Sequence, residues 1–162
     1  MTYLLFLGVT VCLVGMCSSH LCLLNPRQRG SLSGYNKAAT EDCYLTQGEC
    51  GGRMSDPNNM AVFQRGMNYT VILQKNLDHF NTTNPGSFDI TLHHKTGISY
   101  YTRTLATIPD TAAPSLSLYM TDVYIPHDLQ LSESPSYVIE VVYNTNTIPV
   151  TFRQCADILV IM

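Results

Sequence analysis

The stretch Tyr137-Val138-Ile139-Glu140-Val141-Val142-Tyr143 decides the fold class of this chain of 162 residues. It consists almost entirely of β-branched and aromatic residues, which favour extended strands. The polar sequence Asn144-Thr145-Asn146 follows and has the composition of a turn. Residues 150–160 are again apolar and β-branched. The end of the chain is therefore predicted to be two strands joined by a turn.

Four earlier stretches also have strand composition, with turn-forming residues between them: residues 67–74, 88–92, 98–108 and 118–125. No segment repeats apolar residues with helical spacing over a helical length. Short strands separated by turn signals predict an all-β protein, an antiparallel sandwich of the immunoglobulin or fibronectin-III kind. Residues 21–56 are rich in Gly, Ser, Asn and Pro, and they are expected to form an ordered loop region tied by cysteines.

The N-terminal stretch is predicted to be a secretory signal peptide, residues 1–19. Residues 1–16 carry no charge and are almost all apolar, and Cys17 and Ser19 supply the small side chains that precede a cleavage site. Residues 20–162 would then form one secreted domain that begins at His20. An N-terminal histidine offers its α-amine and its ring Nδ1 to one metal, and such nitrogen donors suit Cu(II). A cut one or two residues away would remove this argument.

Composition excludes several classes of function. The formal net charge is −3 with only 9 Lys and Arg, which gives no electrostatic footprint for nucleic acid. Beyond the signal peptide, no stretch reaches the roughly 18 to 20 apolar residues of a membrane span. The motifs of serine hydrolases, zinc proteases and phosphate-binding loops do not occur. We expect a secreted, extracellular monomer, with glycosylation acceptors at Asn68 and Asn81.

Four cysteines remain once Cys12 and Cys17 leave with the signal peptide. An even number of cysteines in an oxidising compartment predicts two disulfides, and three pairings are possible. The remaining residues are Cys22, Cys43, Cys50 and Cys155. They contain no C-x-x-C spacing, which argues against a zinc ribbon or a thioredoxin-type site.

Two further residues are candidate metal ligands. His79 lies in a polar loop directly after a predicted strand, where scaffolds present functional side chains, although a solvated loop histidine has the same pattern. Asp157 interrupts an apolar closing strand, so it requires either a metal or a hydrogen-bond partner. The adjacent His93 and His94 point to opposite faces of a strand and are expected to end it on the solvent side. His127 is expected at the surface.

Four motifs, taken in chain order, carry a family resemblance: residues 20–30 (HLCLLNPRQRG), Cys50-Gly51-Gly52, Asp78-His79 before Pro85-Gly86-Ser87-Phe88, and residues 154–158 (QCADI). With them the chain resembles the copper-binding relatives of lytic polysaccharide monooxygenases, in particular the fungal copper-acquisition proteins. That resemblance implies a histidine brace, in which His20 and His79 hold copper and Asp157 joins them. Together with chain position, it also favours disulfides Cys22–Cys43 and Cys50–Cys155.

Three functions remain open at this point. The first is capture, storage or delivery of copper outside the cell, with a copper-uptake partner or a surface glycan. The second is a monooxygenase that uses the copper to oxidise a polysaccharide. The third is a metal-free recognition module. Asp157 discriminates between the first two, because a carboxylate bound to the metal crowds the open position that oxygen activation needs.

Overall fold

The computed structural model describes residues 20–96, 99–131 and 137–162, so the predicted signal peptide lies outside the described residues. Its elements, in chain order, are β1 (His20–Asn25), the 3-10 helices η1 (Glu41–Cys43) and η2 (Glu49–Gly52), β2 (Ala61–Gln64), β3 (Asn68–Leu77), β4 (Ser87–Thr96), β5 (Ser99–Pro109), β6 (Ser117–Tyr124), β7 (Tyr137–Asn144) and β8 (Thr151–Ile161). Within these ranges, no helix is long and apolar enough to span a membrane.

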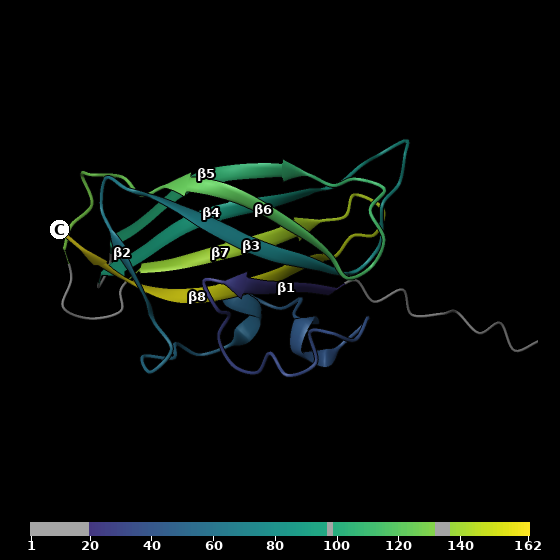
Figure 1. Ribbon diagram of the computed structural model, residues 1–162, viewed down its shortest axis with the longest axis horizontal. Coiled ribbons are helices and arrows are strands. Elements are labelled where there is room, and N and C mark those ends of the chain that lie inside the picture. The colour runs from purple at the N-terminus through teal and green to yellow at the C-terminus, as the bar shows by residue number, and fades with distance from the viewer. Residues whose placement is uncertain (1–19, 97–98, 132–136) are drawn as a thin grey trace, which may run out of the picture.

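The strands form two sheets that face each other across the core (Figure 1). The smaller sheet has the order β1-β3-β6, and the larger has the order β2-β8-β7-β4-β5. The predicted all-β sandwich is confirmed. Among the strands described, β2 and β8 pair in parallel and the others pair antiparallel. Two strands lie outside every predicted strand. Most of β1 falls in residues 21–56, which were expected to be loop, so that prediction is wrong for its first residues. Both β1 and β2 depend on pairing with strands far along the chain, β3 and β8.

The core lies between the two sheets because alternate residues of each strand point inward. In β7 the inward side chains are Tyr137, Ile139, Val141 and Tyr143, all at most 2% exposed. The inward residues of β1 and β3 meet them from the smaller sheet: Leu21, Leu23, Val71 and Leu73. Removing this apolar surface from water is the main stabilising contribution to the sandwich.

The loop region between β1 and β2 packs outside the sandwich, below β1 and β8 in Figure 1. Two disulfides hold it there, Cys22–Cys43 and Cys50–Cys155. These are the pairs that chain position and the resemblance favour. The Arg29 amide also donates a hydrogen bond of 2.7 Å to the Cys155 carbonyl on β8. This part of β8 is not paired with β2, which pairs only from Ile158 onward. The region is thus ordered, as expected.

The prediction that His93 and His94 end their strand on the solvent side is wrong. Strand β4 continues to Thr96 and lies inside the larger sheet, between β5 and β7. The ring of His94 is 7% exposed and stacks on Tyr137 with a centroid distance of 4.0 Å. His93, on the opposite face, contacts Glu140 at 3.0 Å. Histidine is polar enough to suggest a strand end, but here each ring has a specific neighbour.

Candidate metal centre

The structure brings His20 and His79 to the same end of the sandwich. His20 is the first residue of β1, and it pairs with Leu77, the last residue of the antiparallel β3. His79 follows Leu77 by two residues. Both histidines are buried, at 2% and 9% exposure. Strand pairing alone therefore brings the backbones of the two predicted nitrogen ligands to the same end of the sandwich, although they are distant in sequence.

A row of aromatic rings leads from His20 into the core. The ring centroid of Tyr44 lies 5.0 Å from that of His20 and 5.9 Å from that of Phe152. Phe152 is in turn 6.5 Å from Tyr143, and the hydroxyl of Tyr143 receives a backbone hydrogen bond from His79. Tyr44 is 39% exposed and Phe152 is buried. The aromatic row connects the surroundings of the two histidines.

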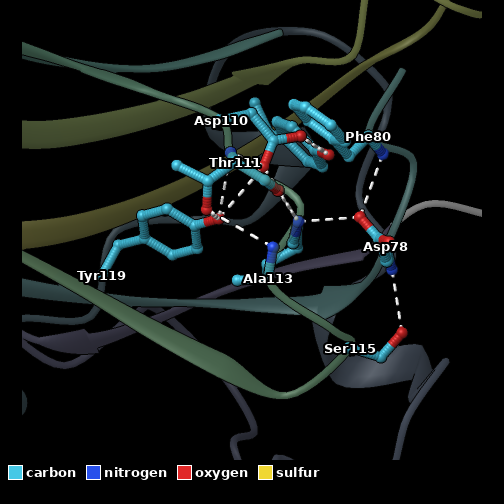
Figure 2. A network of polar contacts seen from close by, with 9 residues as sticks. Asp78, Phe80, Asp110, Thr111, Ala113, Ser115 and Tyr119 are labelled. Carbon is cyan, nitrogen blue, oxygen red and sulfur yellow. Dashed lines mark hydrogen bonds and ion pairs between the residues drawn. The ribbon is translucent and has the colours of Figure 1, made fainter. Parts of the chain in front are cut away.

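A buried lysine, Lys75, lies four residues before His79, and Figure 2 labels its partners Asp78, Asp110 and Thr111. The side chain of Lys75 is fully buried, and its Nζ donates to Asp78 Oδ1 at 2.7 Å, to Asp110 Oδ1 at 2.9 Å and to the Thr111 carbonyl at 2.7 Å. Burial lowers the pKa of Lys75, but the hydrogen bonds to the two aspartates outweigh burial and raise it. The ammonium group is therefore charged and has three acceptors.

Asp110 connects this lysine to the larger sheet. Its Oδ1 also accepts from the Thr111 amide at 2.8 Å and the Tyr119 hydroxyl at 3.1 Å, and its Oδ2 accepts from the Tyr143 hydroxyl at 2.6 Å. Burial and the neighbouring Asp110 both raise the pKa of Tyr143. Tyr143 is thus a neutral donor to Asp110 under ordinary conditions, and its oxygen can still accept from His79.

Asp157, the third predicted ligand, is hydrogen-bonded to other residues. Arg29 donates to both of its oxygens, at 3.0 and 2.6 Å, and the Ser55 hydroxyl and the Asp56 amide add bonds of 3.0 and 2.7 Å. Asp157 is five residues beyond Phe152, which is about 16 Å along an extended strand. The structure thus supplies hydrogen-bond partners for this buried carboxylate, and its role as a metal ligand stays a prediction.

Three solved structures resemble the chain over most of its length. An AA10 lytic polysaccharide monooxygenase from Streptomyces lividans is 16% identical with a TM-score of 0.59, covering 86% of this chain and 99% of that one. The catalytic domain of a lytic polysaccharide monooxygenase from Listeria monocytogenes is 17% identical with a TM-score of 0.57, and one from Jonesia denitrificans is 14% identical with a TM-score of 0.55. Both cover 88% of this chain and 100% of theirs.

The chain has the fold of the lytic polysaccharide monooxygenases. The fold implied by the resemblance is thereby confirmed, while the specific likeness to copper-acquisition proteins stays a prediction. No family model and no curated protein matches the sequence. At these identities the likeness establishes the fold and not the activity.

In this monooxygenase-like fold, the histidine pair has the donor chemistry that copper requires. If the chain is cut before His20, two imidazoles and the α-amine of His20 would give three nitrogen donors, which suit Cu(II). Across the described ranges, one group of three potential ligands has atoms within 4.8 Å of one another, Cys50, Glu140 and Cys155. Its two cysteines share a disulfide and offer no thiolate. The residues at the His20 end therefore fit the metal better.

Sequence reasoning missed Lys75, Asp110 and Tyr44 as neighbours of the site. One signal was available for Lys75, since it shares its strand face with the core residues Val71 and Leu73. A lysine at an inward position requires a charged partner. Asp110 gave no such signal, because it directly follows a strand, where an exposed aspartate is ordinary.

We expect Asp157→Asn to destabilise the protein by about 3 kcal/mol, since Arg29 would lose its buried counter-charge. Burial raises the pKa of Asp157, but bonds from Arg29, Asp56 and Ser55 outweigh burial and lower it. The stability contributed by the pair is therefore present above the unfolded pKa of about 3.9 and is lost as the pH falls below it. Urea unfolding between pH 3 and 7 measures both effects. If the variant kept native stability but bound copper more weakly, Asp157 would have to be a copper ligand after all.

Proposed function

We propose that this chain, once cut before His20, is a secreted copper-binding protein that holds the ion with His20 and His79. The pairing of His20 with Leu77, two residues before His79, carries this proposal. A copper ion held there would supply one-electron chemistry with oxygen or peroxide. The chain's own contribution is to present two imidazoles and an amine. Phe152 is buried and packs against Tyr44, whose ring contacts that of His20.

Oxidation of an extracellular polysaccharide is the activity that we propose first. The solved structures with this fold are named as polysaccharide monooxygenases. Asp157, whose binding to the metal would favour copper capture, is engaged by Arg29 instead. Tyr44 presents a partly exposed ring next to His20, where a sugar face could stack. These observations favour a site with an open position for a substrate.

Copper capture is the second candidate, and one surface feature favours it. Asn81 is exposed, lies two residues beyond His79, and begins the sequence Asn81-Thr82-Thr83, which accepts N-linked glycans. A glycan there would obstruct the approach of a flat polymer surface and leave a free ion unobstructed. Mass spectrometry of protein secreted by a eukaryotic host would show whether the chain begins at His20 and whether Asn81 carries a glycan.

The decisive experiment is a Cu(II) titration of the mature protein, followed by electron paramagnetic resonance. We expect one Cu(II) with nitrogen ligands. His79→Ala should weaken binding by more than about 100-fold, because even outer-shell changes cost 10- to 100-fold. His127→Ala is the matched control, since it removes an exposed loop histidine outside the site.

The same protein, loaded with copper, is then incubated with chitin or cellulose, a reductant and peroxide. Oxidised oligosaccharides support the monooxygenase, and tight copper binding without them supports capture. A protein that starts at His20 and binds no copper would overturn the proposal in favour of a metal-free recognition module.

A further inference from the structure

The turn that carries His79 is held at three consecutive main-chain amides. The Asp78 amide donates to Ser115 Oγ at 2.9 Å, and the Phe80 amide donates to Asp78 Oδ1 at 2.9 Å (Figure 2). Between them, His79 makes its backbone hydrogen bond to the Tyr143 hydroxyl. A turn bound at every amide gives its central residue one backbone orientation. The side chain of His79 therefore leaves the backbone in a defined direction.

The groups that hold this turn belong to one network. Lys75 lies on β3, four residues before His79, and its ammonium group joins Asp78 to Asp110. Asp110 follows β5 and accepts from Tyr143 on β7. The network thus connects the turn to both sheets of the sandwich. A change at Tyr143 would reach His79 through one hydrogen bond, and a change at Asp110 would reach it through two.

Core packing alone does not account for this arrangement. Burying an ammonium group between carboxylates costs desolvation free energy, and well-packed apolar residues are often as stable or more stable. Lys75 occupies an inward position in line with Val71 and Leu73, where an apolar side chain would suffice for packing. What the charged group adds is direction, because each of its three bonds fixes a partner in place.

We propose that Lys75, Asp110 and Tyr143 form a positioning device for His79. The network fixes the turn 78–80 before a metal arrives, and so sets the orientation of the His79 ring relative to His20. Outer groups of this kind orient metal ligands and change metal affinity. None of the three residues binds the metal itself. The inference rests on the proposed copper site, but its structural part can be tested without copper.

The test compares Tyr143→Phe with Tyr137→Phe. Both tyrosines lie on β7, point into the core and are at most 2% exposed. Tyr143 serves the His79 turn, whereas Tyr137 donates to the Gln130 carbonyl at 2.9 Å. Each substitution removes one buried hydroxyl and keeps the ring. The contact of Tyr143 with Phe88, at 4.4 Å, is retained, so the variant keeps its core packing.

In metal-free protein, Tyr143→Phe should raise the hydrogen-exchange rate of the His79 amide about ten-fold, and Tyr137→Phe should leave it unchanged. With Cu(II), Tyr143→Phe should weaken binding about ten-fold and shift the resonance spectrum, while Tyr137→Phe keeps the native values. Asp78→Asn is a second variant on a partly exposed side chain, and it should also accelerate exchange at the turn by weakening the bond to Lys75.

The two proposals fail in different ways. If native protein binds no copper, the proposed function fails, and amide exchange still decides whether the network holds the turn. If native protein binds copper and the two tyrosine variants match in exchange rate, affinity and spectrum, the positioning role is overturned. Equal losses of copper affinity in both variants, with an unchanged His79 amide, would also overturn it, since that result shows a general loss of stability.

Discussion

One residue added before His20 is expected to weaken Cu(II) binding by more than about 100-fold, the upper limit for changes outside the first shell. The extension converts the α-amine into an amide, which cannot serve as a neutral amine donor. The chelate between that amine and the ring Nδ1 of His20 is then lost, although both imidazoles remain. Competition titration against a chelator of known affinity measures the difference between the native and extended forms.

The matched control adds one residue after Met162, which is 74% exposed and lies at the other end of the chain. This form should keep native affinity and the native resonance spectrum. If the N-terminally extended protein bound copper as tightly as the native one, the brace would be excluded, and His79 would have to act with other ligands.

Removing the Cys50–Cys155 disulfide should cost about 5 kcal/mol of unfolding free energy, and removing Cys22–Cys43 about 3 kcal/mol. The difference follows from the loops that the bonds close, since the sequence separations are 105 and 21. A cross-link over a longer loop removes more conformational entropy from the unfolded chain. Urea unfolding of the two double Cys→Ala variants gives both values.

Removing Cys22–Cys43, the disulfide that closes the shorter loop, should reduce copper affinity more than removing Cys50–Cys155 does. Cys22 is two residues beyond His20 on β1, and Cys43 precedes Tyr44, whose ring contacts His20. The Cys50–Cys155 bond attaches η2 to β8 and includes no residue next to His20 or Tyr44 in the chain. A reversed order of stabilities would show that strain or residual structure outweighs loop closure in this protein.

The amino-acid sequence alone determined the all-β class and the strands β3 to β8. Backbone extension is a local property, because β-branched residues restrict their own side-chain rotamers and alternate between faces. His20 and His79 could be proposed for the same reason: a cleavage pattern and a loop after a strand are both visible within a few residues. The predicted disulfide count needed only the number of cysteines and the compartment.

Tertiary structure decided which groups meet. Arg29 reaches Asp157 across 128 positions of sequence, and nothing local distinguishes that partner from a metal. The same holds for Lys75, whose acceptor Asp110 follows a different strand, and for β2, which becomes a strand only beside β8. A buried polar group must find a partner, and its sequence context shows that need. The partner itself is set by how the two sheets pack, because only that packing brings distant residues together.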